Sequence, residues 1–147
     1  KELLKESGYP GMKVLEFAFA DDETNSFLPH NYTNNCVVYT GTHDNDTVLG
    51  WYSQAKGWEK KHCDTYLGIR EDDEVNWVFI ETAYKSVADY AIIQMQDILG
   101  LGSEARINVP STLGGNWAWR ISKDALNKDI SARLKALAIN YSRWEDI

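Results

Sequence analysis

The sequence lacks an excess of basic residues, a long hydrophobic run and a disulfide framework, and each absence narrows what the protein can be. The formal net charge is −7, so we expect no nucleic-acid partner. No apolar stretch approaches the ~20 residues that a membrane-spanning helix needs, so we expect no membrane partner either. The two cysteines, Cys36 and Cys63, have no metal-ligand spacing and favour a reducing, cytoplasmic location, although a single disulfide between them is an open alternative.

An initiator methionine and a signal peptide are missing as well. The chain starts at Lys1, and its first residues are charged and helical in pattern, unlike a secretion signal. We find no internal repeat and no low-complexity segment. What is present is typical of a folded domain: 44% hydrophobic and 25% charged residues over 147 positions, enough for one domain with a core. We therefore expect a globular segment cut from a longer chain.

Apolar runs predict three short strands, separated by longer segments with helical periodicity. The runs cover residues 12–19, 37–39 and 91–95, and the first is apolar at nearly every position, as in strands buried on both faces. Apolar residues at spacings of three or four predict helices. We place these helices at residues 1–7, 73–90 and 128–143, with two short helices between residues 47 and 67.

Short strands with long helical connections favour a parallel α/β sheet, because parallel strands need crossover connections. A complete (β/α)8 barrel needs ~250 residues and eight strands. Three strands in 147 residues without an initiator methionine therefore predict the C-terminal part of such a TIM barrel, incomplete on its own, with residues 1–147 as one fragment of the barrel domain. Open strand edges and an open apolar face lead us to expect that the fragment self-associates. The exposed patch is expected among Val14, Leu15, Phe17, Val37, Val38, Ile92 and Ile93.

The most informative stretch follows the second expected strand. Residues 37–39 are β-branched or aromatic, and four polar side chains, His43 to Asp46, come a few residues later. Parallel barrels present catalytic residues in this way, at the carboxyl ends of their strands. We expect His43 and Asp44 to be functional, whereas for Asp46 and Thr47 a functional role and a cap on the next helix are equally open alternatives. His43, Asp44 and Asp46 are also ligand-capable, but adjacent ligands on one turn seldom converge, so we expect no metal ion and no cofactor.

The stretch from Tyr39 to Thr47, YTGTHDNDT, closely resembles a signature of the 4-α-glucanotransferase family, the amylomaltases and disproportionating enzymes. Further stretches are similar to the same family, in the same order along nearly the whole chain: PGMKVL from Pro10, PHNY from Pro29, LGLGSEAR from Leu99 and GNWAWR from Gly115. The resemblance implies that the expected strands are the sixth, seventh and eighth of a catalytic barrel.

This resemblance implies a retaining transfer of segments of α-1,4-glucans, with a glucan or maltooligosaccharide as substrate. One carboxylate of such an enzyme attacks the anomeric carbon and another protonates the leaving sugar. No Asp or Glu here matches the family's nucleophile or general acid/base, so we expect the fragment alone to be inactive. Asp44 matches a third acid, which binds sugar hydroxyls and stabilises the transition state. Substrate-binding roles are implied for His43, Asn45, Asn108 and Trp117.

Two positions depart from the family pattern, and an alternative function stays open. Glu16 stands where glutamine is frequent, and Ser111 where glycine is frequent. The alternative function is a non-catalytic carbohydrate-binding domain. In such a domain five tryptophans could stack on sugar rings, and for each of them packing in the core or an interface is the alternative. They are Trp51, Trp58, Trp77, Trp117 and Trp119. Because the last two alternate along the chain, we expect one of them to face outward.

Overall fold

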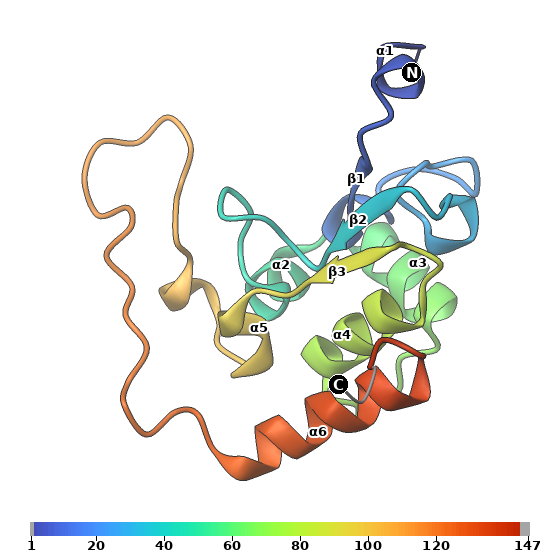
Figure 1. Cartoon of the computed structure of the whole chain (residues 1–147). Coiled ribbons are helices and arrows are strands. Elements are labelled where there is room, and N and C mark those ends of the chain that lie inside the picture. The colour runs from blue at the N-terminus through green and yellow to red at the C-terminus, as the bar shows by residue number, and fades with distance from the viewer. Residues whose placement is uncertain (1, 145–147) are drawn as a thin grey trace.

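The structure is a computed structural model that describes residues 2–144. Its centre is a parallel sheet (Figure 1). Strands β1 (Gly11–Val14), β2 (Cys36–Tyr39) and β3 (Tyr90–Ile92) lie side by side in the order β1-β2-β3. Both strand pairs are parallel. The carboxyl ends of the strands therefore meet at one edge of the sheet, and the predicted parallel α/β class is confirmed.

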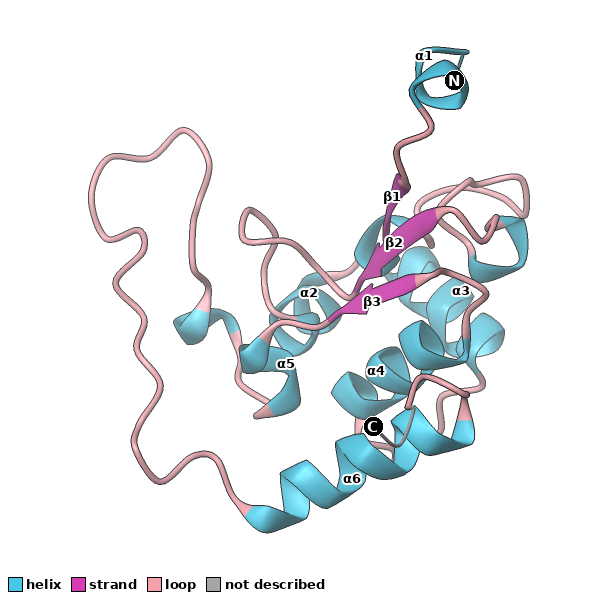
Figure 2. Ribbon diagram, in the orientation of Figure 1, coloured by secondary structure: helices cyan, strands magenta, loops and turns pink. Residues whose placement is uncertain are grey.

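Helices fill the connections between the strands and follow the last one (Figure 2). Helix α1 stands apart from the sheet, α6 lies along α4, and a long loop without helix or strand precedes α6. Lys1 of the predicted first helix lies outside the described residues. The α-helices are α1 (Glu2–Ser7), α2 (Val48–Gln54), α3 (Gly57–Leu67), α4 (Val75–Lys85), α5 (Met95–Ile98) and α6 (Lys128–Asn140). The 3₁₀ helices are η1 (Leu15–Phe17), η2 (Pro29–Asn31) and η3 (Ser103–Ala105).

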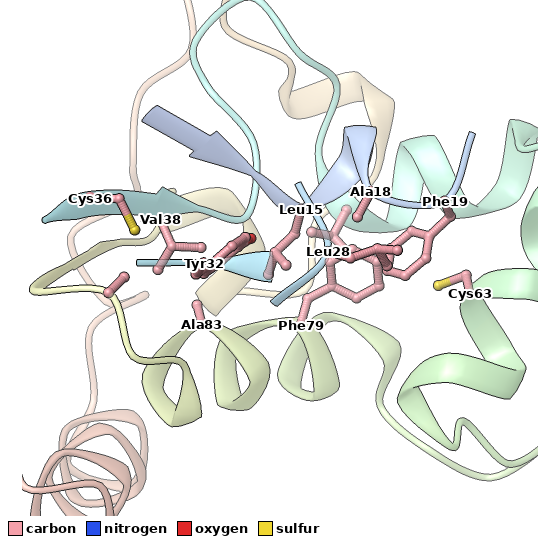
Figure 3. Packing of buried hydrophobic residues seen from close by; sticks show 12 residues of the cluster. Leu15, Ala18, Phe19, Leu28, Tyr32, Cys36, Val38, Cys63, Phe79 and Ala83 are labelled. Atoms are coloured by element: carbon pink, nitrogen blue, oxygen red, sulfur yellow. The ribbon is translucent and has the colours of Figure 1, made fainter. Parts of the chain in front are cut away.

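The hydrophobic core lies between one face of the sheet and the helices beneath it (Figure 3). Val38 of β2 points toward α4, while Phe19, from the turn after β1, packs edge-on against Phe79 with ring centroids 5.9 Å apart. Cys36 and Cys63 are buried free thiols at opposite ends of the cluster. The structure thus favours reduced cysteines over the disulfide alternative.

The other face of the sheet carries exposed apolar side chains. Met12, Tyr90 and Ile92 are 60%, 61% and 51% exposed, and Met12 and Tyr90 stand in the same register row across β2. The prediction of an open apolar face is therefore confirmed, but its residues were partly wrong. Val14, Leu15 and Val38 are fully buried. Val38 is buried because side chains alternate between the two faces of a strand and Val38 faces the helices.

Strand β1 is shorter than the apolar run at residues 12–19 predicted. Pairing with β2 ends at Val14, and the chain turns into η1, where the Ala18 N–H donates to the Leu15 carbonyl at 2.9 Å. The buried residues here are Leu15, Ala18 and Phe19. Residues three and four positions apart face the same side in a helical turn but not in a strand. A continuous apolar run does not distinguish these two conformations.

Helix α4 ends at Lys85 instead of continuing to residue 90. The Ser86 backbone is extended, and its hydroxyl donates to the Ala83 carbonyl at 2.8 Å. Arg143, which follows α6, donates at 2.7–2.9 Å to carbonyls around this end, those of Tyr84, Ser86 and Ala88. The apolar periodicity of residues 73–90 does not indicate this distant arginine. The sequence therefore predicted a helix that continues into β3.

The third strand also differs from the predicted range of residues 91–95. Met95 already begins α5, so Gln96 and Asp97 lie within a short helix and do not simply end the strand. The buried Asp97 carboxylate accepts the Thr40 hydroxyl at 2.5 Å and the Val48 N–H at 2.8 Å. Asp97 thereby joins the carboxyl end of β2 to the first turn of α2.

Candidate functional site

Residues 42–45 form a tight turn beyond β2 that carries Asp44. The Asn45 N–H donates to the Thr42 carbonyl at 3.0 Å. Asn45 Oδ1 accepts two further hydrogen bonds from Thr42, from its N–H at 3.0 Å and from its hydroxyl at 2.7 Å. The side-chain oxygen of Asn45, a residue predicted to bind substrate, is thus turned into the protein. His43 and Asp44 lie inside this turn with side chains 54% and 50% exposed.

The Asp44 carboxylate is held from outside its own turn. Asn108 Nδ2 donates to Asp44 Oδ1 at 2.6 Å, and His43 Nε2 lies 3.3 Å from the same oxygen. Among the residues that the structure describes, the hydrogen bonds to this carboxylate reach Oδ1, which leaves Oδ2 for a ligand. The predicted residues His43, Asp44 and Asn108 are therefore brought together.

Arg106 holds the turn of residues 42–45 against the segment that carries Asn108, and sequence reasoning missed this role. Its guanidinium donates to the Asp44 main-chain carbonyl at 2.7 Å and to the Asn108 carbonyl at 3.0 Å. Arg106 closes the LGLGSEAR stretch that carries part of the family resemblance, which was the available signal. One side chain thus anchors both partners of the Asp44–Asn108 hydrogen bond.

Trp117 completes the exposed side of the cluster. Its ring lies 5.2 Å from the His43 ring, centroid to centroid, with an angle of 36° between the planes. The backbone adopts φ +60°, a left-handed conformation that is costly for a bulky residue, and its N–H donates to the Ile107 carbonyl at 2.8 Å. Ser111 has φ +65°, which explains why glycine suits that position.

The tryptophans divide between packing and exposure. Trp77 is 7% exposed, and the Arg133 guanidinium lies 3.9 Å from the centre of its ring, so the core alternative is correct for it. Trp51 packs against the core ring Phe79. Trp117 is 58% exposed while Trp119 is half-buried, so one of the alternating pair does face outward.

Asp46 and Thr47, the two candidate helix caps, have different roles. The Thr47 hydroxyl accepts the Gly50 N–H at 3.1 Å and caps α2. The Asp46 carboxylate accepts the Ser103 hydroxyl at 2.7 Å and the Thr47 N–H at 2.8 Å, so it joins α2 to η3. Within residues 2–144 no group of three or more His, Cys, Asp or Glu side chains is arranged to hold a metal ion.

Glu16 is the most perturbed acid near the site and was not predicted to belong to it. Its side chain, placed just after β1, is only 2% exposed. Burial raises its pKa to about 9, with the negative charges of Asp97 and Asp46 adding to the effect and Arg106 opposing it. The carboxyl is therefore neutral at pH 7. A charged residue in an apolar run that is otherwise interrupted only by Lys13 was the signal for it.

A cavity of about 270 Å³ borders this cluster, lined among others by Glu16, Asp44, Asn45, Asp46, Trp51 and Arg106. A larger cavity of about 740 Å³ lies among α4, α5 and α6 and shares no lining residue with it. We place the site at the smaller cavity, because the carboxylates at the carboxyl ends of the strands converge there. A parallel α/β sheet with such an edge is typical of α/β enzymes.

Comparison with known proteins identifies the family. A family model described as 4-alpha-glucanotransferase matches residues 1–126. The 4-alpha-glucanotransferase of Clostridium butyricum is 46% identical over 145 residues, 98% of this chain and 30% of the relative. That of Thermus thermophilus is 51% identical over 138 residues, 89% of this chain and 28% of the relative. The chain belongs to the 4-alpha-glucanotransferase family.

Two further comparisons bear on fold and location. An amylomaltase from Streptococcus agalactiae, solved in complex with acarbose, superposes with a TM-score of 0.94 at 36% identity, over 98% of this chain and 29% of that one. The chloroplastic/amyloplastic 4-alpha-glucanotransferase of Solanum tuberosum is 48% identical over 136 residues, 92% of this chain and 24% of the relative. The chain thus spans less than a third of the length of these relatives. Their names favour the transferase over the carbohydrate-binding alternative.

Proposed function

We propose that the full-length protein containing this chain is a 4-α-glucanotransferase that moves segments of α-1,4-glucans to acceptor sugars with a retaining mechanism. Family membership supports this activity. The observation that carries it is the Asp44 carboxylate, half-exposed at the carboxyl edge of the sheet with one oxygen fixed by Asn108 and the other open. An α-1,4-glucan or a maltooligosaccharide is the substrate.

The chain then supplies strands six to eight of a catalytic (β/α)8 barrel, and residues 1–147 are the C-terminal part of that domain. The parallel order β1-β2-β3 supports this placement, since consecutive barrel strands are neighbours. The open face with Met12, Tyr90 and Ile92 supports it as well. In the full-length protein the remaining barrel strands close over this face, and in the isolated chain a second copy covers it.

Asp44 acts on the sugar ring at the reacting centre. A carboxylate from outside this chain attacks the anomeric carbon while a second acid gives its proton to the leaving oxygen. The acceptor hydroxyl then displaces the enzyme carboxylate and returns a proton to that acid/base. Asp44 accepts hydrogen bonds from sugar hydroxyls, and these charge-assisted bonds strengthen as positive charge develops on the ring.

The neighbours of Asp44 form a wall for the sugar. His43 donates to the same sugar, and Trp117 offers an exposed face beside it. Asn108 keeps the carboxylate oriented, and Asn45 acts mainly through the turn that it closes. Because the amylomaltase from Streptococcus agalactiae was solved with acarbose, we expect acarbose to bind the full-length protein at this wall.

Incubation of the full-length protein with maltotriose tests the proposed function. Transfer yields glucose together with longer maltooligosaccharides, and the products retain the α-configuration. A chelator is expected to leave the rate unchanged, since the reaction uses carboxylates and no metal ion. Absence of longer products would contradict a transferase, and chelator-sensitive turnover would favour a metal enzyme.

A cytoplasmic location belongs to the proposal. It is supported by two buried free thiols, which suit a reducing compartment. The relative from Solanum tuberosum is chloroplastic/amyloplastic, so a plastid is the competing location. In the part of the chain that is described, no helix is long and apolar enough to cross a membrane.

A further inference from the structure

Asp97 is a buried acid that bonds to both ends of the loop that carries Asp44. This loop, residues 41–47, leads from the end of β2 to the start of α2. The Thr40 hydroxyl, just before the loop, donates to Asp97 Oδ2 at 2.5 Å. The Val48 N–H, just after the loop, donates to Asp97 Oδ1 at 2.8 Å. Each carboxylate oxygen therefore holds one end of the loop, and one side chain fixes the separation of the two ends.

The position of Asp97 is itself fixed by neighbouring elements. Asp97 lies on α5, which follows β3 at the carboxyl edge of the sheet (Figure 2), and it is only 1% exposed. Its main-chain carbonyl accepts from Nδ2 of the buried Asn76 on α4 at 2.8 Å. Gln94, which precedes α5, donates to the Asp46 carbonyl within the loop at 3.4 Å. The segment after β3 therefore binds the loop from a position that α4 fixes.

A helix cap alone does not account for Asp97. Thr47 already caps α2 by accepting from the Gly50 N–H at 3.1 Å. A second cap would need no contact with Thr40, which is fully buried at the far end of the loop. Burying a carboxylate costs desolvation free energy, which only well-placed hydrogen bonds offset. Asp97 therefore constrains Thr40 and Val48 to one geometry.

The loop has little freedom to adjust if its ends move. Gly41 has no room for a side chain, because a Cβ there would lie 2.6 Å from Glu16 Oε1. Directly after it, residues 42–45 form the hydrogen-bonded turn that carries Asp44. A shift at either end of the loop is therefore transmitted to this turn and changes the direction of the Asp44 carboxylate.

We propose that Asp97 is a positioning residue for Asp44: its carboxylate holds the two ends of the loop at the separation that aims the Asp44 carboxylate at the substrate. This inference rests on the proposed transferase function. Asp97 touches no reacting atom. It acts from the neighbouring strand's end, through the Thr40 hydroxyl and the Val48 N–H.

The test uses two matched pairs of variants of the full-length enzyme. Thr40→Val and Tyr52→Phe each remove one hydroxyl that donates to an aspartate, at 2.5 Å to Asp97 and at 2.6 Å to Asp64. Asp97→Ala and Asp64→Ala remove the two acceptors. Because the Tyr52–Asp64 bond joins α2 to α3, the second pair shows what the loss of a comparable contact does outside the Asp44 loop.

The two pairs should differ in kcat. Misplacement of a group by about 1 Å can cost up to 100-fold in rate, so Asp97→Ala should lower kcat about 10- to 100-fold with KM nearly unchanged. Thr40→Val should cause a smaller loss, because the bond to Val48 remains. Asp97→Asn should retain most of kcat, since its amide oxygen accepts from Val48 and its amide nitrogen donates to the Thr40 hydroxyl oxygen. Tyr52→Phe and Asp64→Ala should leave kcat near the wild-type value, even where they lower stability.

The Asp44→Asn background separates positioning from a merely structural role. If Asp97 acts through the Asp44 carboxylate, Asp97→Ala should lower kcat much less in Asp44→Asn than in the wild-type enzyme. An equal fold-loss in both backgrounds would overturn the proposal. If Asp97→Ala does not fold, Thr40→Val takes its place in this double-mutant cycle.

The remaining outcomes distinguish this inference from the function beneath it. A wild-type enzyme that does not transfer glucan would overturn the proposed function, and this inference with it. An active wild-type enzyme whose kcat falls no further in Asp97→Ala and Thr40→Val than in the Asp64→Ala and Tyr52→Phe controls would overturn the role of Asp97 alone.

Discussion

Asn108 donates a 2.6 Å hydrogen bond to the Asp44 carboxylate from 64 residues further along the chain. Arg106 reinforces the contact by donating to the main-chain carbonyls of both residues. The bond fixes one carboxylate oxygen, so the other is oriented before any ligand arrives. In the proposed transferase this preorganisation is the contribution of the loop after η3, since an aligned carboxylate needs no rearrangement as charge develops.

The Asn108–Asp44 bond predicts a measurable coupling in the full-length enzyme. A hydrogen bond to a charged group contributes about 1.5–3 kcal/mol, so Asn108→Ala should lower kcat/KM about 10- to 100-fold. A double-mutant cycle with Asp44→Asn measures how far the two residues act together. We expect the double variant to lose little beyond Asp44→Asn. Fully additive losses would show that Asn108 acts independently of Asp44.

Two tryptophans with opposite environments form a matched pair of variants. Trp117 is 58% exposed beside His43. Trp117→Ala should raise KM severalfold, because an aromatic contact contributes about 0.5–1.5 kcal/mol. The melting temperature should stay nearly unchanged. Trp77 is 7% exposed, so Trp77→Ala should cost about 3–5 kcal/mol of unfolding free energy. Kinetics and denaturant unfolding of both variants check the assignment. A destabilised Trp117→Ala protein with normal KM would contradict it.

The chain expressed alone is predicted to be inactive and to self-associate. It carries no match to the family's nucleophile or acid/base, so maltotriose should remain unchanged. The exposed face with Met12, Tyr90 and Ile92 should raise the sedimenting mass above that of one chain as concentration increases. Ile92→Lys should reverse this by placing a charge on the face. A compact monomer at all concentrations, or turnover that depends on Asp44, would refute this prediction.

Glu16 predicts a pH dependence of stability with a defined sign. Its pKa is raised from 4.5 to about 9 on folding, so between these values the folded state binds more protons than the unfolded state. The unfolding free energy therefore falls as pH rises through this window. Glu16→Gln removes this part of the slope, so the variant should gain stability over wild type between pH 5 and pH 8. Asp97, whose pKa burial also raises, contributes the same sign to both proteins. Urea unfolding of both proteins at pH 5 and pH 8 measures this difference. If the unfolding free energies of wild type and Glu16→Gln changed equally between the two pH values, the assignment would be wrong.

Local chemistry allowed much of the fold and part of the site to be predicted from sequence. The run at residues 37–39 predicted β2, and Thr47 was one of the two caps expected for the following helix. His43 and Asp44 could be singled out because polar residues follow a buried strand. These inferences depend only on residues that are neighbours in the sequence.

The remaining features depend on contacts between distant segments. Nothing near residue 85 indicates that Arg143 will satisfy carbonyls at the end of α4. Arg106 and Asn108 meet Asp44 only because the loop after η3 returns to the turn after β2. Glu16 was visible as a charge in an apolar run, but its neutral state follows from burial and from neighbouring acids that only the folded structure brings near.

The central claim is that Asp44 stabilises the transition state of glucan transfer, and Asp44→Asn in the full-length enzyme tests it most directly. Asparagine keeps the shape and removes the charge, so kcat should fall on the order of 10²–10³-fold while KM and melting temperature change little. Asp46→Asn is the control, because that carboxylate joins α2 to η3 and its loss should lower stability by about 1 kcal/mol with little effect on kcat. Full turnover in Asp44→Asn together with inactive, stably folded Asp46→Asn would contradict the account.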